Sequence, residues 1–333
     1  MDQDIDQIAN EISACLQSGA PIWYQNLAEG LSPLHAAAFI QNEALVKLLL
    51  DKGALWNAVD YLKNTAGDVA LSFNNGAIYR VIRDAGIRSG ASRISLSSNF
   101  HIANSEISVD KHGQNICLVE VEGEDVGVMM GWEEGIMLKT VRKLCERHPK
   151  SSRLKVLNVG FGLGIIDNFF QGLDEPPIEH VIIEAHPNVL EFMKKTGWYE
   201  KPRVKILQGR WQEFIRNPND LSIHGFDIVF TDTFSERYTD LRQFFECIPN
   251  LLADEDSRFS FFNGLGATDS LFYDVYTQIS ELHLSSLGLY VEWSDVDVSF
   301  DEEGGRWGRS REYFSLPIYR LPIARMKRST LEC

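Results

Sequence analysis

The sequence predicts an α/β protein in which a short all-α repeat segment precedes a larger domain built on a mainly parallel sheet. Short apolar runs alternate with helical stretches from residue 155 onward, and a glycine-rich turn follows the first run. Near the N-terminus, Gly19, Gly53 and Gly86 recur 34 and 33 residues apart. Strands that alternate with helices form parallel sheets, and a period of this length is typical of helical repeats. A chain of 333 residues has room for both parts.

The repeat is expected to occupy residues 1–90. Its fullest copy begins at Ser32-Pro33-Leu34-His35, continues through three alanines and an apolar stretch at 45–50, and resembles the ankyrin repeat. Alanines let paired helices approach each other closely. We expect Gly53 and Gly86 to adopt the left-handed conformation that glycine tolerates after a helix. His35 is expected to form hydrogen bonds within its turn rather than to bind a ligand.

Residues 91–125 are interpreted as a linker and N-terminal extension. Serine and other loop-forming residues are frequent over 87–112. A strand is expected at 116–121, and an acidic turn follows it at 122–125. The larger domain is therefore expected to span 126–333.

Seven apolar runs predict the strands of a doubly wound, Rossmann-like sheet. The last two runs lack a clear crossover helix between them, so they could form an antiparallel hairpin at the sheet edge. The runs are Val156–Val159, Val181–Ile183, Val204–Leu207, Ile228–Phe230, Phe259–Phe262, Leu289–Trp293 and Tyr313–Leu316.

The first predicted strand leads into a turn with three alternating glycines, Gly160-Phe161-Gly162-Leu163-Gly164. Glycines there let the backbone approach a ligand at the carboxyl edge of the sheet. The second strand ends in Glu184, 20 residues after Gly164, where a carboxylate accepts hydrogen bonds from both hydroxyls of a ribose. Trp211 follows the third strand and could face an adenine, and Asp232 ends the fourth.

Four short motifs together resemble the guanidinoacetate methyltransferase family: Met129 to Glu133, the Gly160-Phe161-Gly162 turn, Glu184, and the pair Asp232-Thr233. The GxGxG spacing is common among S-adenosylmethionine-dependent methyltransferases, whereas dinucleotide enzymes usually carry GxGxxG. With an ankyrin-like segment in front, the chain resembles the fungal-type (type IV) protein arginine δ-N-methyltransferases. The resemblance implies a class I methyltransferase fold, S-adenosyl-L-methionine as methyl donor, S-adenosyl-L-homocysteine as product, and no metal.

The resemblance also implies which residues line the cofactor pocket. An aromatic residue upstream of Met129 usually closes that pocket, and Phe100 is the candidate. The other expected cofactor-binding residues are Met137, Gly160, Phe161, Gly162, Leu163, Gly164, Ile165, Glu184, Ala185, His186, Trp211, Gln212 and Asp232.

Glu133 and Asp232 are the expected catalytic pair. Two carboxylates can hold the terminal nitrogens of a guanidinium by charge-assisted hydrogen bonds and leave electron density on the internal nitrogen. Other interpretations stay open here, since Asp232 could cap the following helix and Glu133 could merely occupy the first turn of a helix. His186 is expected to be a loop residue near the adenosine rather than a base. Trp307 could line the substrate site or pack on the sheet.

Three functions are compatible with these motifs. The leading one is methylation of the δ-nitrogen of an accessible arginine in a protein, with a ribosomal protein as candidate because of the family's association with ribosomal proteins. The second is methylation of a small guanidino compound such as guanidinoacetate, for which Arg306, Arg309 or Arg311 could supply a cationic anchor. The third is an ankyrin-type adaptor with a non-catalytic α/β domain. Intact glycines and carboxylates argue against the third.

Charge and cysteine usage limit the partners. A formal net charge of −15 argues against nucleic acid or an anionic membrane as main partner and suits a basic protein. The five cysteines are scattered without metal-binding spacing, as in proteins of reducing compartments. No apolar run approaches the roughly 20 residues that span a bilayer, and no secretion-signal pattern is present. We expect a soluble protein of the cytoplasm, with the nucleus as a further compartment.

Overall fold

We analysed the protein in a computed structural model. It describes residues 20–92, 133–215, 225–233, 238–299 and 314–327, the single residues 11, 14, 15 and 18, and the backbone of three strands within 105–129; residues 89–92 are described by their backbone alone. The chain forms two compact units. The first comprises residues 1–96 with 269–279, and the second comprises 97–268 with 280–333. A segment from the later part of the sequence thus belongs to the N-terminal unit.

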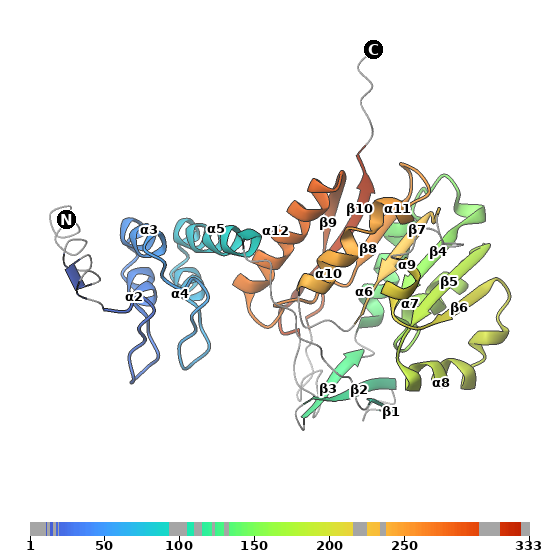
Figure 1. The fold of residues 1–333 in the computed structure, drawn as a ribbon, viewed down its shortest axis with the longest axis horizontal. Helices are drawn as coiled ribbons and strands as arrows, with labels where there is room; N and C mark the ends of the chain where they lie inside the picture. Colours follow the sequence, from blue (N-terminus) through green and yellow to red (C-terminus); the bar gives the residue numbers. More distant parts are fainter. Residues whose placement is uncertain are drawn as a thin grey trace, which may run out of the picture. The chain divides into compact units, whose positions relative to one another are not determined.

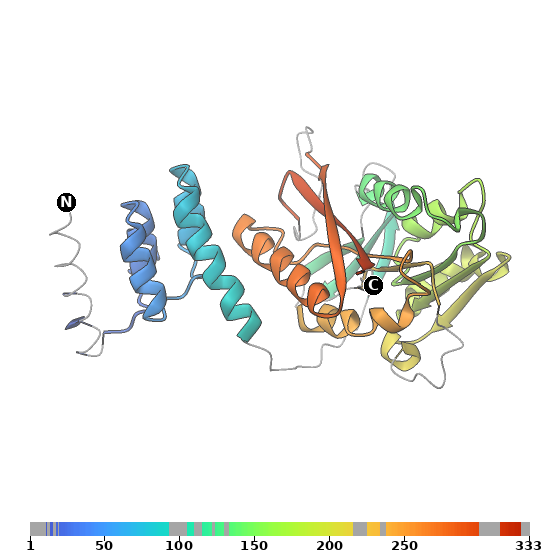
Figure 2. The same ribbon diagram turned by 90° about the horizontal axis from the view of Figure 1, so that it is seen from above.

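Two helix–turn–helix pairs form most of the described N-terminal part of the first unit (Figure 1). The first helix of each pair contacts its counterpart, as does the second, so the pairs stack side by side (Figure 2). Ser32 and Thr65 start their pairs with capping boxes, which satisfy backbone N–H groups at the beginning of the helix. The pairs are α2 (Pro33–Phe39) with α3 (Glu43–Asp51), and α4 (Ala66–Ser72) with α5 (Gly76–Ser92).

The core of this unit consists of the small and branched residues that the repeat pattern predicts. Ala37, Ala38 and Val46 are fully buried. His35 lies 2.8 Å from the Ser32 hydroxyl through Nδ1 and 3.0 Å from a backbone carbonyl through Nε2, so its expected structural role is confirmed. The left-handed conformation predicted after α3 is also confirmed, because Gly53 has a φ of +93°.

The corresponding prediction for Gly86 is wrong. Gly86 lies inside α5, which continues past it to Ser92. Its lack of a side chain serves packing instead. A Cβ at this position would lie only 2.9 Å from both the Trp56 ring and the Val275 side chain. The glycine therefore permits a close approach of helices rather than a chain reversal.

A further helix of the first unit comes from the later part of the chain. α12 (Ser270–Ser286) is one continuous helix, and its N-terminal part packs against the repeats. Trp56 meets Phe272 edge-on with ring centroids 5.5 Å apart, and the Tyr79 hydroxyl donates a hydrogen bond of 2.7 Å to Asp274. Nothing in the repeat pattern predicts this helix as a neighbour of the repeats.

The second unit begins with a small antiparallel sheet. Its strands are β1 (Ser105–Val109), β2 (Asn115–Val121) and β3 (Glu124–Met129), in the order β1-β2-β3. The strand expected at 116–121 is confirmed as β2. The acidic turn expected at 122–125 is wrong for Glu124 and Asp125, which belong to β3, and Glu122 and Gly123 lie outside the described residues. The next described helix along the chain is α6 (Glu134–Cys145).

A seven-stranded mixed sheet forms the centre of this unit in the order β6-β5-β4-β7-β8-β10-β9. Neighbours from β6 to β8 are parallel, while β10 runs antiparallel to both β8 and β9. The predicted class, an α/β Rossmann-like domain preceded by a small all-α segment, is confirmed. The strands are β4 (Lys155–Val159), β5 (Glu179–Glu184), β6 (Val204–Gln208), β7 (Ile228–Thr231), β8 (Arg258–Phe261), β9 (Leu289–Asp297) and β10 (Ile318–Met326).

The last strand lies further along the chain than predicted. No strand occurs at residues 314–317 of the expected Tyr313–Leu316 run, and Tyr313 lies outside the described residues. β10 starts at Ile318 and contains Pro322, a residue that usually argues against an inner strand because it lacks an N–H. The predicted antiparallel hairpin is confirmed for β9 and β10, which pair over their whole length.

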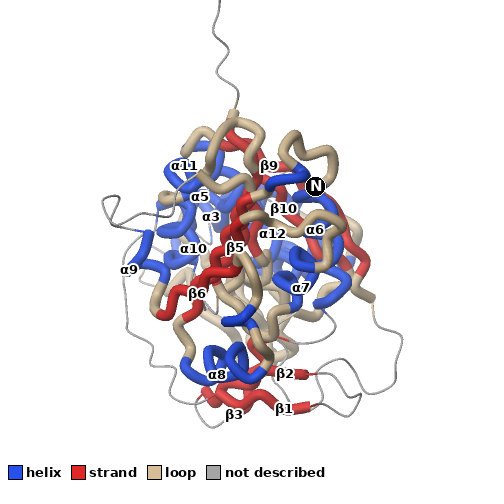
Figure 3. The backbone as a smooth tube through the Cα atoms, turned by 90° about the vertical axis from the view of Figure 1, so that its right-hand side faces the viewer, coloured by secondary structure: helices blue, strands red, loops and turns tan. Residues whose placement is uncertain are grey.

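Helices cover both faces of the large sheet (Figure 3). α6 and α7 (Ile165–Gln171) lie on one face, and α9 (Trp211–Ile215), α10 (Tyr238–Phe245) and α11 (Ile248–Leu251) lie on the other. α8 (Pro187–Lys195) packs with the first face through Val189 and Met193. Within the described part of the chain, no helix has the length and apolar character needed to cross a membrane.

Candidate active site

The turn after β4 adopts a backbone conformation that favours glycine. Gly160, Gly162 and Gly164 have φ values of +94°, +54° and +72°. A Cβ at Gly160 would overlap the backbone carbonyl oxygen of Asp232. The alternating glycines therefore set the path of the chain from β4 into α7 and bring it directly against the end of β7.

Glu184 is the last residue of β5, and its side chain is hydrogen-bonded to the backbone of the glycine turn. Its Oε2 accepts a 2.8 Å hydrogen bond from the backbone N–H of Phe161, and its Oε1 accepts from Ala185 and His186 at 2.8 and 2.7 Å. A carboxylate offers about four acceptor positions. Among the described groups these three donors leave one position of Oε2 open to a ligand hydroxyl. The side chain is 8% exposed, so a ligand would meet it in a nearly dry environment.

Backbone hydrogen bonds bring the carboxyl ends of four strands together. The N–H of Asp232 donates to the carbonyl of Val159 at 2.9 Å, and the N–H of Gly209 donates to the carbonyl of Glu184 at 2.9 Å. Because β4 to β7 are parallel, their carboxyl ends lie at one edge of the sheet, where ligands of doubly wound folds bind. The glycine turn, Glu184, the start of α9 and Asp232 therefore share this edge.

The two expected catalytic carboxylates differ in their exposure to water. Glu133 is 1% exposed and stands immediately before α6, but its side chain makes no capping hydrogen bond to that helix. Asp232 is half-buried just after β7, and burial raises its pKa to about 7. The next described helix, α10, begins only at Tyr238, so Asp232 does not cap it. Near neutral pH a carboxyl with this pKa can give up or take up a proton.

A buried network of polar side chains is hydrogen-bonded to the backbone of the glycine turn. Asn158 Nδ2 donates to the carbonyl of Gly160 at 3.0 Å and to Asp167 at 2.8 Å. The other Asp167 oxygen lies 2.9 Å from His180 Nε2, and Gln171 donates to His180 Nδ1 at 2.9 Å. Asn158, Asp167 and His180 are fully buried. The sequence analysis missed this network, although polar residues within apolar runs could have indicated it.

The expected cofactor residues differ in how they meet the site. Phe161 presents its backbone to Glu184, while its ring is buried edge-on against Trp198 with centroids 5.0 Å apart. Leu163 and Ile165 belong to the same apolar cluster. Met137 is fully buried on α6. Phe161, Leu163 and Ile165 therefore pack together within and just after the glycine turn.

The remaining expected cofactor residues follow β5 and β6. The imidazole of His186 accepts the N–H of Asn188 at 3.2 Å and so caps α8, while Ala185 is exposed beside it. Trp211 is 8% exposed and packs edge-on against Phe244, and Gln212 next to it is half-buried. The expected residues Phe100, Arg306, Trp307, Arg309 and Arg311 lie outside the described part of the chain.

In the described ranges, no group of three or more His, Cys, Asp or Glu side chains is arranged to hold a metal ion.

Comparisons with known proteins match both parts of the chain. The family model described as Ankyrin repeat matches residues 29–61, and the model described as Guanidinoacetate N-methyltransferase matches residues 111–283. A protein of Cryptococcus neoformans named Protein arginine N-methyltransferase 2 is 43% identical over 93% of this chain and 90% of its own length. The protein of the same name from Aspergillus oryzae is 34% identical over 86% of this chain and 78% of its own.

Solved structures with a similar fold include spermidine synthase from Thermotoga maritima. It is 18% identical in sequence, with a TM-score of 0.43 over 67% of this chain and 72% of that chain.

Proposed function

The chain belongs to the protein arginine N-methyltransferase 2 family, and from this membership we propose that it transfers a methyl group from S-adenosylmethionine to the δ-nitrogen of arginine residues in a protein substrate. The names of the relatives state arginine N-methylation, and the δ-nitrogen is our inference from the two carboxylates. One observation carries the proposal: Asp232 contacts the glycine turn at the carboxyl edge of the sheet, beside the residue that would hold a ribose.

Glu184 and the glycine turn fit the adenosine part of the methyl donor. Glu184 keeps an acceptor position for a ribose hydroxyl, and its three backbone bonds hold it in place before any ligand arrives. S-adenosylmethionine supplies a methyl group that its own sulfonium already activates. The task left to the chain is to bring an arginine nitrogen to that methyl group in the right orientation.

Glu133 and Asp232 are proposed to provide that orientation. An arginine guanidinium has a pKa of about 13.8 and spreads its charge over three nitrogens, so it is a poor nucleophile. Two carboxylates that hold the terminal nitrogens draw positive charge toward themselves and leave electron density on the δ-nitrogen. The low exposure of Glu133 strengthens its attraction, because little water screens the charge.

The proton balance assigns a second role to Asp232. As the δ-nitrogen forms its bond to the methyl carbon, the carbon–sulfur bond breaks and the nitrogen must lose its proton. Burial raises the pKa of Asp232 to about 7, so this carboxylate is a better proton acceptor at neutral pH than an ordinary aspartate. S-adenosylhomocysteine and a protein carrying δ-N-methylarginine are the products.

The proposed substrate is a basic protein. A chain with a formal net charge of −15 attracts basic partners and repels nucleic acid. Ribosomal proteins are rich in arginine and lysine, so we propose one of them as substrate and the cytoplasm or nucleus as the place of reaction. The alternative substrate, a small guanidino compound, would use the same two carboxylates but would need a cationic anchor for its own carboxylate.

The decisive experiment follows labelled methyl groups. The purified protein is incubated with methyl-labelled S-adenosylmethionine and, in parallel, with a ribosomal protein fraction or with guanidinoacetate. Hydrolysis and fragmentation mass spectrometry should find δ-N-methylarginine in the protein fraction. Label on a terminal nitrogen would refute the δ assignment, and label only on guanidinoacetate would favour the small substrate. Cofactor binding without any transfer would favour the adaptor.

A further inference from the structure

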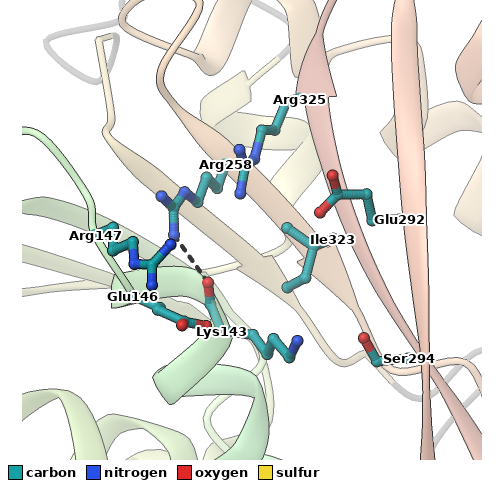
Figure 4. Close-up of a pocket in the computed structure, with 8 residues that line it drawn as sticks. All are labelled: Lys143, Glu146, Arg147, Arg258, Glu292, Ser294, Ile323 and Arg325. Atoms are coloured by element: carbon teal, nitrogen blue, oxygen red, sulfur yellow. Dashed lines mark hydrogen bonds between the residues drawn. The ribbon is translucent and has the colours of Figure 1, made fainter.

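We propose that the second unit contains an anion-binding cleft that takes the phosphate group of a small phosphomonoester. The cleft lies between the C-terminal end of α6 and the strands β8, β9 and β10, and it has a volume of about 320 Å³ (Figure 4). Four cationic side chains line it, Lys143, Arg147, Arg258 and Arg325. Neither the family comparison nor the methyl-transfer proposal requires this feature.

The cleft lies away from the candidate active site. Arg258 is the first residue of β8 and pairs with Arg325 on the antiparallel β10. The candidate active site is at the other end of these strands, where Thr231 pairs with Phe261 just before Asp232. A ligand in the cleft therefore meets a different edge of the sheet from a ligand at Glu184.

Positive charge exceeds negative charge in the cleft. Two carboxylates, Glu146 and Glu292, accompany the four cations. Within the described part of the chain, none of these cations lies within 4.0 Å of a carboxylate. Arg147 also holds a left-handed φ of +51° just after α6, a conformation that glycine adopts more easily. On a chain with a net charge of −15, such a cationic cluster stands out.

Two arginines in the cleft have N–H donors that find no acceptor in the part of the chain that the structure describes. Arg258 is 4% exposed, and its Nη1 donates to the carbonyls of Lys143 and Leu144 at 2.8 and 2.9 Å. Its Nε is buried and finds no acceptor among the described residues, and the same holds for Nε of Arg325. Burial lowers the pKa of Arg258, and the neighbouring charge of Arg325 lowers it further.

A purely structural role explains only part of this arrangement. The Nη1 bonds of Arg258 close the C-terminal turn of α6, where cations are favourable. These two hydrogen bonds do not explain why the Nε atoms of Arg258 and Arg325 lack acceptors among the described residues. Nor do they explain why the guanidinium of Arg325 lies beside that of Arg258. Unpaired buried donors and adjacent like charges both cost free energy, and one bound anion would relieve both.

Phosphate suits the cleft better than a carboxylate does. A phosphate group carries up to two negative charges and tetrahedral oxygens, which several guanidinium forks can bind at once. The cleft is also larger than one phosphate group needs. Figure 4 shows Glu292 and Ser294 across the cleft from Arg147 and Arg258, where they can bond to hydroxyl groups of the organic part of the ligand.

Calorimetry and thermal unfolding of the full chain test the proposal. The probes are inorganic phosphate and glycerol 2-phosphate, with acetate and chloride at equal ionic strength, each with and without S-adenosylhomocysteine. We expect both phosphates to bind saturably and to raise Tm, independently of the nucleoside. Arg325→Gln should weaken phosphate binding about tenfold or more, and it should raise Tm in phosphate-free buffer because like-charge repulsion is removed.

The matched control is Arg153→Gln, which makes the same charge change at an exposed site and should leave both responses unchanged. Equal stabilisation by acetate or chloride would overturn the proposal, as would equal phosphate affinity of Arg325→Gln and Arg153→Gln. Exclusion of glycerol 2-phosphate while inorganic phosphate binds would overturn the monoester assignment. Should Arg325→Gln fail to fold, Lys143→Gln tests the same loss of affinity.

Discussion

Glu133 is the residue on which the proposed chemistry depends most directly. Its carboxylate is buried and makes no capping hydrogen bond to α6. We expect Glu133→Gln to keep the fold and the cofactor affinity and to lower methyl transfer by about 10²–10³, the scale seen when one electrostatic contact to a transition state is lost. Single-turnover kinetics and calorimetry with S-adenosylhomocysteine measure the two effects separately.

The neighbouring Glu134 supplies the control. It is exposed on the first turn of α6, so Glu134→Gln makes the same chemical change one residue away in water. We expect near-normal turnover from it. If the two variants behaved alike, Glu133 would hold no guanidinium.

Asp232 predicts how activity depends on pH. Burial raises its pKa to about 7, and only the ionised form attracts a guanidinium. We therefore expect kcat/KM to rise through pH 7, to level off above about pH 8, and to fall close to tenfold per unit below about pH 6. A profile of kcat/KM that is flat between pH 6 and 8 would contradict the assignment.

Asp232→Asn should separate stability from activity. A carboxyl whose pKa is raised by folding stabilises the protein below its unfolded pKa, and that contribution is lost as the pH rises through the folded value of about 7. The amide avoids this loss, so the variant should have a higher Tm than the wild type at pH 8 but transfer methyl groups slowly. Differential scanning calorimetry at pH 5 and pH 8 tests the sign.

At the scale of elements, the glycine turn determines where β4 and β7 end relative to each other. Gly160→Ala forces an unfavourable φ and a clash with the Asp232 carbonyl, whereas Gly225→Ala, at a φ of +77°, has open space around it. We expect Gly225→Ala to cost about 1 kcal/mol. Gly160→Ala should cost clearly more and abolish binding of S-adenosylhomocysteine. Chemical denaturation and calorimetry compare the pair, and equal effects would argue against the tight turn.

Elements with one clear periodicity were predictable from the sequence, and elements with mixed signals were not. Apolar runs of three to five residues located six strands. Five of these belong to the parallel part of the sheet, where strands buried on both faces are read as continuous apolar runs. β10 was displaced in the prediction because Pro322 lies in its middle. The network of Asn158, Asp167 and His180 was also not predicted, because its residues come from two strands and a helix that are brought together only in the folded protein.

The start of α12 contains a pH-sensitive contact. Asp269 accepts the N–H groups of Leu271 and Phe272, and burial together with the charge of Asp68 raises its pKa to about 6. Its stabilising contribution is therefore present below about pH 4 and lost as the pH rises through 6. Asp269→Asn keeps the cap, so we expect it to stabilise the first unit above pH 6 by on the order of 1 kcal/mol and to change little near pH 4.

Hydrogen exchange in α4 and α5 at pH 4.5 and 7.5 measures this effect. Asp174→Asn, at an exposed loop of the second unit, is the control and should leave exchange in these helices unchanged. A stabilisation by Asp269→Asn that is the same at both pH values would show that the charge of Asp269 is not its cause.

At the scale of the whole molecule, the first unit is proposed to present the protein substrate. A chain that begins near residue 95 should keep its affinity for S-adenosylhomocysteine and lose methyl transfer to a protein. It should also aggregate, because Leu271 and Val275 are fully buried and pack beside Gly67 and Gly86 of the repeats. Adding Leu271→Gln should restore solubility but not activity on a protein. Unchanged activity of the truncated chain would refute the presentation role.

The sharing of α12 between the two units has a consequence for synthesis on the ribosome. The repeats leave the exit tunnel first, but the helix that completes their unit lies beyond residues 97–268. At about 5–20 residues per second, translating that stretch takes roughly ten to thirty seconds. During this interval the apolar side of α5 that later packs against α12 is exposed to solvent in the nascent chain. Chaperone occupancy of ribosome-bound intermediates should therefore persist past the repeats and fall only after the codons for residues 269–279 have been read.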